Sequence, residues 1–410
     1  MGDLNKNVPR LRFPGYTDAW VKCKLGDVGK TFTGLSGKTK EDFGHGEGKF
    51  VTYINVFKNP ISDLNELENV EIDDNQAQVN YGDVLFTTSS ETPDEVGMSS
   101  VWLGKQDNIY LNSFCFGYRP QLVFDYIYLA FMLRSPSIRN HFMLLAQGIS
   151  RYNISKNKAM EISVPIPELN EQTKIGEFFK HLDDLITVNE RELNKLKDLK
   201  KSYLEKMFPK NGSDIPELRF PGYADAWVKC ELGDVVKKIK SYSLSRDVET
   251  DKHTGYKYIH YGDIHTNVAG YIDEESILPN IKADDFDILD AGDLIVADAS
   301  EDYQGIAKPA VLVVKPTSNV VAGLHTIALR PTHSNSIFLY YLLQTDLFKQ
   351  FGKKAGTGMK VFGITFSNLS KFHTSFPTED EQHKIGKFLH SIDDLITVNE
   401  HKLFNSILSS

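Results

Sequence analysis

Cysteine is scarce in this sequence. The 410 residues include three cysteines, Cys23, Cys115 and Cys230, which lie far apart in the chain. A disulfide-stapled domain or a cysteine-rich zinc site needs more cysteines at closer spacing. The sequence therefore argues against both classes and fits a reducing compartment.

Long apolar runs are missing as well. Runs such as Phe338 to Leu343 and Ala310 to Val314 are far shorter than the roughly 20 residues that span a bilayer. Residues 1–6 contain no apolar core of a signal peptide. We expect a soluble protein of the cytoplasm that is not bound to a membrane.

An excess of positive charge is also absent. Lysine and arginine total 46 against 55 aspartates and glutamates, which gives a formal net charge of −9. This balance excludes a strongly basic nucleic-acid binder at the level of the whole chain, although a local basic face remains possible. Residues 61–75 hold six acids and no base, and residues 241–300 hold 13 acids and four bases. Those two stretches cannot face a phosphate backbone without an electrostatic cost.

Recognisable catalytic and metal-binding motifs are lacking. The sequence has no Gly-x-x-x-x-Gly-Lys-Ser/Thr phosphate loop, no His-Glu-x-x-His and no Cys-x-x-Cys. It also has no Asn-Pro-Pro-Tyr or Asp-Pro-Pro-Tyr motif, and its 12 histidines show no ligand spacing. The sequence therefore offers no candidate catalytic or metal-binding residues.

What the sequence does contain is a large internal repeat. Residues 9–28 and 216–235 are identical at 17 of 20 positions, and residues 171–190 and 381–400 at 14 of 20. The offsets of 207 and 210 residues divide the chain into two halves, each the size of a whole domain with its connector.

The stretches between the repeated blocks have diverged. They share short islands, such as residues 82–86 (Gly-Asp-Val-Leu-Phe) and 292–296 (Gly-Asp-Leu-Ile-Val). Simple drift after a duplication is one interpretation. Drift alone would also have eroded the ends, so we favour ends that perform one shared task and middles that perform two different ones.

Two segments have the periodicity of long helices, 171–210 and 378–410. Apolar residues recur at heptad spacing in both, and Thr378 with Glu381 forms a capping box at the start of the second. A 40-residue helix, roughly 60 Å long, cannot bury such a stripe alone, so the two helices are expected to pack together. The predicted helix-pair interface comprises Ile175, Phe179, Leu182, Ile186, Asn189, Leu193, Leu196, Ile385, Leu389, Ile392, Ile396, Asn399 and Leu403.

Asn189 and Asn399 occupy matching heptad positions in this interface. Each could face solvent at the rim of its helix. Alternatively, the two could form a buried polar pair that fixes the register of the helices.

The diverged middles carry signals for both strands and helices. We predict strands at 51–56, 84–88, 256–261 and 310–314, and helices at 125–133 and 336–351. The fold class is α+β, with two mixed α/β domains, a pair of long helices and a pseudo-twofold internal repeat. The predicted divisions are a conserved N-terminal segment (1–28), a first variable domain (29–170), a central helix (171–210), a repeated conserved segment (211–235), a second variable domain (236–377) and a distal helix (378–410).

The order of these blocks resembles the DNA-specificity subunit of type I restriction-modification systems. The resemblance rests on the duplicated opening at 20–28, the island at 82–85, and the run from Gly148 through 164–167 to Glu171 and Gln172. In the second half Gly358, Ile364, Pro377, Glu381 and Gln382 stand in the matching places. Two positions depart from the first copy, since Gly363 replaces Asn153 and Ser375 replaces Pro165. The second helix also stops at Ser410, short of a counterpart to Phe208 and Pro209.

The resemblance implies a non-catalytic DNA-binding subunit. Each variable domain would be a target-recognition domain that reads one half of a split double-stranded DNA target, and the helices would form an antiparallel coiled coil between them. Two modification subunits would supply S-adenosylmethionine and adenine methylation, and restriction subunits would add ATP- and Mg-dependent translocation and cleavage. A coiled-coil scaffold and a two-domain enzyme of an unrecognised class are the alternatives.

Polar and basic loops of the variable domains are the candidate DNA-facing stretches. Glycine permits close backbone approach there, and lysine, arginine, asparagine and tyrosine supply phosphate and base-edge contacts. The stretches are 34–40, 87–90, 148–156, 237–242, 297–300 and 353–360. The candidate DNA-binding residues are Lys38, Lys40, Thr88, Ser89, Ser90, Arg151, Tyr152, Asn153, Lys156, Lys238, Lys240, Tyr242, Tyr261, His265, Lys354 and Lys360.

Overall fold

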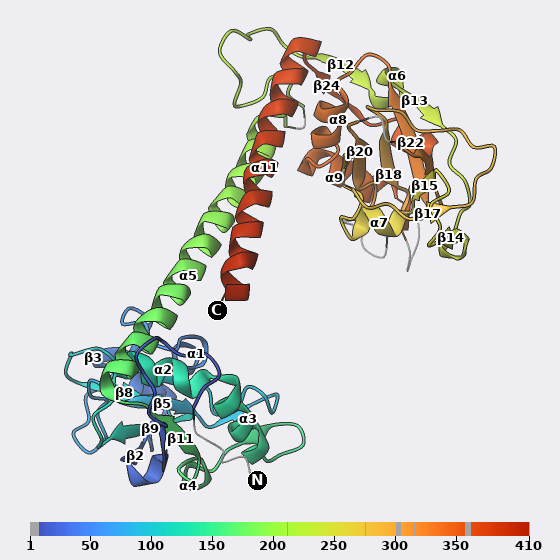
Figure 1. The fold of residues 1–410 in the computed structure, drawn as a ribbon. Coiled ribbons are helices and arrows are strands. Elements are labelled where there is room, and N and C mark those ends of the chain that lie inside the picture. Colours follow the sequence, from blue (N-terminus) through green and yellow to red (C-terminus); the bar gives the residue numbers. More distant parts are fainter. Residues whose placement is uncertain are drawn as a thin grey trace. The chain divides into compact units, whose positions relative to one another are not determined.

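The computed structural model describes residues 8–210, 212–274, 276–300, 305–314, 317–356 and 362–409 (Figure 1). These fall into two compact units. The first comprises residues 1–187 with 406–410, and the second comprises residues 188–405. The long helix α5 (Leu169–Lys206) belongs to the first unit up to Thr187 and to the second unit from Val188 onward.

The first unit contains the first of the two variable domains, which we call recognition domains after the role that the resemblance implies, and it is built on two small sheets. One sheet has the strand order β2-β9-β5-β7 and the other the order β4-β3-β8. Their strands are β2 (Gly29–Thr33), β3 (Phe43–Val51), β4 (Leu67–Val70), β5 (Val84–Thr87), β7 (Ser99–Val101), β8 (Ile109–Leu111) and β9 (Cys115–Pro120). The helices are α1 (Tyr53–Lys58), α2 (Tyr126–Arg134), α3 (Pro136–Leu145) and α4 (Lys156–Ala159). Helices α2 and α3 pack on the first sheet and enclose the main core with it.

The second unit repeats this plan despite its different sequence. Its larger sheet has the order β13-β22-β18-β20-β16, and its smaller sheet the order β14-β17-β15-β21. The strands are β13 (Val236–Ile239), β14 (Glu249–Thr250), β15 (Tyr256–Ile259), β16 (Tyr271–Ile272), β17 (Asn280–Ile281), β18 (Leu294–Ala297), β20 (Pro309–Leu312), β21 (Asn319–Ala322) and β22 (Thr326–Pro331). The helices are α6 (Leu232–Val235), α7 (Tyr261–His265), α8 (Ser336–Leu342), α9 (Asp346–Ala355) and α10 (Phe366–Leu369). Strands β13, β22, β18 and β20 thus take the places of β2, β9, β5 and β7.

The strand predicted at 256–261 ends at Ile259, because His260 caps α7. Two further sequence expectations for these domains are wrong at a threonine. The strand predicted at 51–56 ends at Val51, because Thr52 caps a helix there by accepting a hydrogen bond from the backbone of Asn55. The single helix predicted at 336–351 is two helices, because Thr345 accepts from the backbone of Phe348 and starts α9 as a new helix. Both errors come from threonine caps inside apolar runs, where the local composition suits either structure.

The shared Gly-Asp islands form the same turn in both domains. Gly82 and Gly292 have φ values of 87° and 91°, a conformation that favours glycine. The next residue, Asp83 or Asp293, is buried and accepts two hydrogen bonds from an arginine on the adjacent strand. These partners, Arg119 and Arg330, are thereby held with raised pKa values. The islands are therefore structural and fix the start of the central strand.

The repeated blocks close each recognition domain. Strand β1 (Val21–Lys24) pairs antiparallel with β11 (Ser163–Ile166), and β12 (Val228–Glu231) pairs in the same way with β24 (His373–Phe376). The strand that precedes each long helix is thus held by the conserved segment that precedes the recognition domain. The sequence signal Val-Pro-Ile-Pro before the first helix is this strand and its exit.

A buried Glu-Gln pair begins each long helix, α5 and α11 (Glu379–Ser409). Glu171 receives two hydrogen bonds from Arg12 at 2.5 and 2.7 Å, and Glu381 receives two from Arg219 at 2.8 Å each. Beside them, the side-chain oxygens of Gln172 and Gln382 accept from the backbone N–H groups of Asp125 and Asn335, which cap α2 and α8. The pair therefore joins the long helix to the conserved segment and to its recognition domain.

A glycine one turn further along each long helix permits close contact with α2 in the first unit and with α8 in the second. A Cβ at Gly176 would lie 2.6 Å from the backbone nitrogen of Tyr128, and one at Gly386 would lie 3.0 Å from that of Phe338. Ile175 accordingly packs on the core of the first domain, and the rings of Phe179 and Phe131 of α2 lie 6.0 Å apart. These two residues, which the sequence predicts in the helix–helix interface, thus contact their own recognition domain.

In the second unit the distal half of α5 packs antiparallel on α11. Tyr203 contacts Phe388, Lys200 pairs with Asp393 at 2.7 Å, and Lys197 pairs with Glu400 at 2.8 Å, so the two residue numbers run in opposite directions. A single apolar cluster contains Leu193, Leu196, Ile385, Leu389, Ile392, Ile396 and Leu403. These seven residues of the predicted interface thus share one apolar cluster. Leu182 and Ile186 belong to the first unit, where Leu182 is buried and Ile186 half-buried.

Both heptad asparagines are buried, with 8% of Asn189 and 7% of Asn399 exposed. The side-chain amide of Asn399 donates to the backbone oxygen of Leu395 in its own helix at 2.8 Å. Of the two interpretations open from the sequence, the solvent-facing one does not hold.

We predict that Arg219→Met destabilises the second unit by about 3 kcal/mol, because it leaves the carboxylate of Glu381 buried without its cation. Replacing both residues by methionine should recover most of that loss, since no unpaired charge then remains. Denaturant unfolding of the full chain, followed by the fluorescence of Trp227, would measure both. Equal stabilities of the single and double variants would contradict the buried ion pair.

Candidate nucleic-acid interface

The first recognition domain brings two of the predicted DNA-facing stretches together. Strand β6 (Ser89–Ser90) pairs antiparallel with β10 (Tyr152–Asn153), with Tyr152 opposite Ser90 and Asn153 opposite Ser89. The backbone N–H of Ile154 also donates to the oxygen of Thr88 at 2.9 Å. Residues about 60 positions apart in the sequence therefore form one surface, which we call the first patch: residues 88–90, 114 and 151–156.

Side chains of the first patch differ in how free they are. Arg151 and Asn153 are exposed, and Arg151 lies over the ring of Phe114 at 5.9 Å. Ser89 and Ser90 are buried. The hydroxyl of Tyr53 donates to the backbone oxygen of Ser89, and the hydroxyl of Ser90 donates to the carboxylate of Glu95. The serines thus shape the strand pair, and the arginine, asparagine, Tyr152 and half-buried Lys156 supply its polar groups. Gly148, with φ of 147°, begins the loop that carries Arg151.

Lys38 and Lys40 lie in another part of the first domain. The ammonium of Lys38 is 3.0 Å from the carboxylate of Asp73, which raises the pKa of this lysine. Lys40 is exposed and begins a 3-10 helix (Lys40–Asp42) whose other two residues are acidic. The structure therefore groups both lysines with acidic side chains and not with the first patch.

The second recognition domain builds the matching strand pair. Strand β19 (Ala299–Ser300) pairs antiparallel with β23 (Phe362–Gly363), and the N–H of Ile364 donates to the oxygen of Asp298 at 2.8 Å. Asp298 thus stands where Thr88 stands in the first domain. We call this surface the second patch: residues 298–300, 325 and 362–363.

The matching positions of the two patches carry different chemistry. Thr88 N donates to the oxygen of Phe114, and Asp298 N donates to the oxygen of His325, so His325 takes the place of Phe114. The ring nitrogen of His325 lies 3.1 Å from the carboxylate of Asp298. Burial raises the pKa of Asp298, and the neighbouring His325 opposes that rise. A hydroxyl and a phenyl ring in one domain thus become a carboxylate and an imidazole in the other.

Predicted residues of the second domain are divided between this patch and its surroundings. Tyr261 lies edge-on to His325 at 5.3 Å, and the Nε2–H of His265 donates to the backbone oxygen of Ala299 at 2.8 Å. Lys238 lies over Phe366 of α10. Lys240 lies instead over the ring of Tyr242 at 4.6 Å, and the hydroxyl of that tyrosine accepts from the N–H of Asp287. Lys354 is exposed in the last turn of α9, and Lys360 lies outside the described residues.

Sequence reasoning missed two members of the patches, Phe114 and His325. Each lies just before the strand that returns beside the centre of its sheet, far in sequence from the loops it joins. The one signal that could have identified them is their shared position just before β9 and β22. The two sequences can be aligned at this position only once the strand order is known. Among the described residues, no cluster of His, Cys, Asp and Glu could hold a metal ion, and no helix is long and apolar enough to cross a membrane.

The comparisons with known proteins identify the class of this two-domain architecture. The family model for the type I restriction modification DNA specificity domain matches residues 17–198 and again residues 224–408. The chain therefore belongs to the family of type I restriction-modification DNA specificity proteins. Specificity subunits are DNA-recognition components and do not catalyse the reactions of their complexes, in agreement with the absence of catalytic motifs from the sequence.

Individual relatives agree with this membership. The chain is 24% identical over 419 residues to a protein described as the specificity subunit of the type I restriction enzyme MjaX of Methanocaldococcus jannaschii, covering 96% of this chain and 91% of the relative. It is 20% identical over 348 residues to the MjaVIII specificity subunit of the same organism, covering 80% and 76%. Among solved structures, the type I restriction-modification S subunit of M. genitalium is similar with a TM-score of 0.60, 13% identity and coverage of 98% and 96%.

Proposed function

We propose that the first and second patches each read one half of a bipartite DNA target. The observation that carries the proposal is the equivalence of the two strand pairs, which occupy one position in a shared topology and present different side chains. Base-edge contacts in a groove supply sequence specificity, and hydroxyl, amide, carboxylate and guanidinium groups make them. Two equivalent strand pairs that carry different side chains can therefore read two different half-sites.

Local charge around the patches supports a phosphate contact despite the net charge of −9. Residues 146–160 contain three basic and no acidic residues, and residues 353–374 contain four basic and no acidic residues. These stretches include β10 and β23, respectively. Arginine and lysine beside a base-reading surface neutralise phosphates and set the position of the protein on the duplex. The acidic stretch 61–75 would then face away from DNA.

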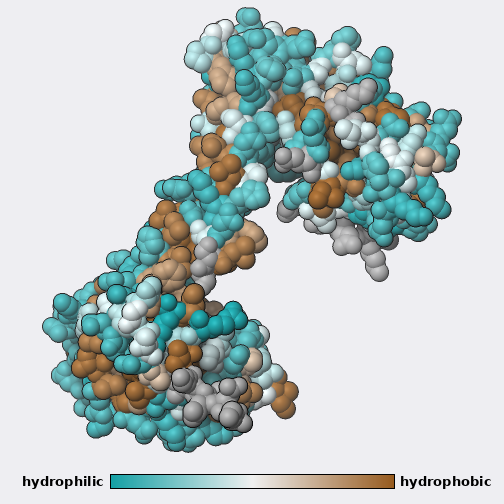
Figure 2. Space-filling view, in the orientation of Figure 1, coloured by the Kyte–Doolittle hydropathy of each residue, from teal (hydrophilic) through white to brown (hydrophobic). Residues whose placement is uncertain are grey.

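The long helices offer a surface for partner subunits. Leu185 and Val188 on α5 have exact sequence counterparts in Leu395 and Val398 on α11, and all four are exposed by 40–51%. Figure 2 shows hydrophobic side chains at the surface along these helices. Exposed apolar residues kept in both copies are typical of a shared docking task. We propose that each copy docks one modification subunit, that restriction subunits join this complex, and that the half-sites are spaced by the helices.

The chemistry of the complex would reside on those partners. S-adenosylmethionine would bind the modification subunits, and ATP with Mg would bind the restriction subunits, so that this chain holds no cofactor. Such a complex acts on cellular DNA, which places it in the cytoplasm. A coiled-coil scaffold would explain the helices and the duplication, but it would not require two strand pairs with different side chains in equivalent positions.

Exchanging residues 236–372 for the corresponding stretch of another specificity subunit should change one half-site of the target. The other half-site should persist, because the first patch and both conserved segments are untouched and the β12–β24 pairing is retained. Sequencing the methylated sites of cells that carry the variant with its modification subunit would show this. Changes in both half-sites would contradict the division of labour.

Arg151→Ala should weaken binding of the assembled complex to its target and reduce the dependence of log K on log salt by about one. The loss follows from one fewer phosphate neutralised. Lys38→Ala is the matched control, because Lys38 already pairs with Asp73. DNA titrations at several salt concentrations would measure the dependence of log K on log salt for both variants. Equal effects of the two substitutions would contradict the assignment of the first patch as the DNA-facing surface.

Leu395→Asp together with Val398→Asp should reduce the affinity for the modification subunit at least about tenfold, a change of ~1.4 kcal/mol. A charge on a desolvated apolar contact is unfavourable, whereas exposed positions tolerate it in the free chain. Leu144→Asp, at a residue of α3 that is 80% exposed, serves as the control. Isothermal titration with the modification subunit would decide, and unchanged affinity would exclude this face as the docking site.

A further inference from the structure

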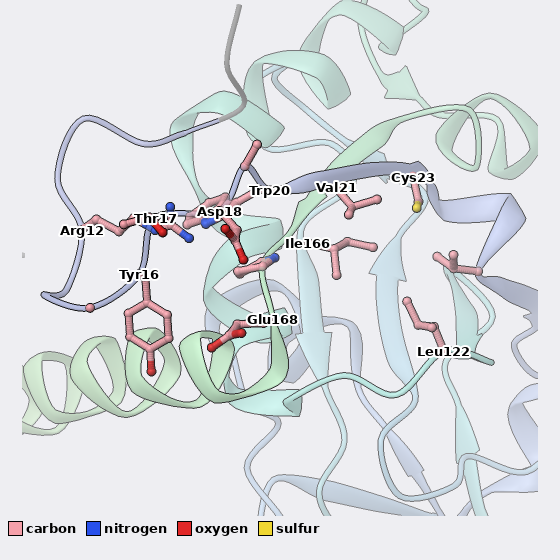
Figure 3. A pocket seen from close by; sticks show the side chains of 14 residues that line it. Arg12, Tyr16, Thr17, Asp18, Trp20, Val21, Cys23, Leu122, Ile166 and Glu168 are labelled. Atoms are coloured by element: carbon pink, nitrogen blue, oxygen red, sulfur yellow. The ribbon is translucent and has the colours of Figure 1, made fainter.

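One equivalent pair of residues, Thr88 and Asp298, differs in charge between the two recognition domains. The conserved frame around them cannot distinguish one half-site from the other, because it is nearly the same in both copies. Figure 3 shows part of this frame, the segment that carries Arg12, Tyr16 and Trp20 next to the start of α5. That segment belongs to a block identical at 17 of 20 positions in the two copies. A difference in what the domains read must therefore come from positions where the side chains differ.

The backbones of Thr88 and Asp298 are held by the same two hydrogen bonds. The N–H of each residue donates to a backbone oxygen just before β9 or β22, at 2.9 and 3.0 Å respectively. The backbone oxygen of each accepts from an isoleucine just after β10 or β23, at 2.9 and 2.8 Å. The two side chains are therefore presented from the same backbone position. Exchanging one side chain for the other breaks none of these bonds.

The carboxylate of Asp298 is accessible and is oriented by a neighbour. Its side chain is 31% exposed, and the Nδ1–H of His325 donates to its Oδ1 at 3.1 Å. Within the part of the chain that the structure describes, no hydrogen bond to Oδ2 is formed, so this oxygen can accept from a base. Burial raises the pKa of the Asp298 carboxyl, and His325 and Lys238 oppose this rise. In its ionised form the group accepts hydrogen bonds and donates none.

A carboxylate on a DNA-facing surface is restricted in what it can contact. Phosphate oxygens repel it, whereas the exocyclic amino groups of bases can donate to it. In the major groove these donors are N4 of cytosine and N6 of adenine, and the adenine amino group has the acceptor N7 beside it. In the minor groove the only such donor is N2 of guanine. In either groove a carboxylate therefore favours a C·G pair.

We infer that Asp298 is a specificity-determining residue that accepts a hydrogen bond from the amino group of a C·G pair in the second half-site. The inference rests on the proposed function of the second patch and deepens it to one residue and one kind of base pair. Thr88 imposes no such requirement on the first half-site, because a hydroxyl both donates and accepts. The charge difference between the two domains thus becomes a difference in the base pairs that they select.

Asp298→Thr tests this inference in the full chain assembled with its modification subunits. Sequencing of the methylated sites should show an unchanged first half-site and a second half-site in which one C·G pair is no longer required. In binding titrations with DNA that carries another base pair at that position, the discrimination against the altered DNA should fall about tenfold. Relaxation at an A·T pair, or an unchanged second half-site with normal methylation, would overturn the inference.

Two further variants separate base selection from charge and from folding. Asp285→Thr removes the same charge from an exposed residue of the second unit and should leave both half-sites unchanged. If Asp298→Thr lowers the melting temperature, Asp298→Asn replaces it, because its amide oxygen can still accept from His325. The amide NH₂ then faces the base and opposes an amino group, so the same C·G pair should lose its preference.

Failure of this inference is distinguishable from failure of the proposed function. If the second patch does not read the second half-site, the exchange of residues 236–372 leaves that half-site unchanged or alters both half-sites. If the exchange changes only the second half-site and Asp298→Thr changes neither, the proposed function holds and Asp298 does not select a base.

Discussion

A buried carboxylate at the start of each long helix is the constraint on which the arrangement of both units depends. Glu171 and Glu381 are almost fully buried, so each requires a cation, and Arg12 or Arg219 from the conserved segment supplies it. The neighbouring glutamine satisfies the backbone where the strand before the helix ends and where the recognition helix begins. Two adjacent side chains thereby join the first turns of each long helix to its own recognition domain.

This anchoring separates a constant frame from a variable surface. The central strand, its Gly-Asp turn and the arginine beside it recur in both recognition domains. The patch lies immediately after that strand, where its backbone is held by hydrogen bonds from β10 or β23 and from the residue that follows it. Side chains such as Thr88 and Asp298 can differ there without disturbing the bonds that position them. A protein built in this way can change what it reads while its helices and conserved segments keep one task.

Local patterns predicted the elements with strong periodicity or exact repetition. The two long helices, their contact along Leu193 to Leu403 and the two variable domains were readable from heptads and duplication, whereas the antiparallel direction followed only from the family resemblance. The failures concern positions where neighbours in space decide. Ile175 and Phe179 have heptad spacing but pack on α2, since Gly176 lets that helix approach. Ser89 and Ser90 have DNA-facing composition but are buried, and Lys38 is basic but is paired with Asp73.

The sequence by itself determined the duplication, the helices, the absence of recognisable catalytic motifs and the stretches from which a recognition surface is built. These properties depend on residues close together in the chain or on identity between the copies. Tertiary structure alone decided that 88–90 meets 151–153 and that Phe114 and His325 complete the patches. Such pairings join residues tens of positions apart. Their free energy comes from burial and strand pairing in the folded state, which leaves no periodic trace in the sequence.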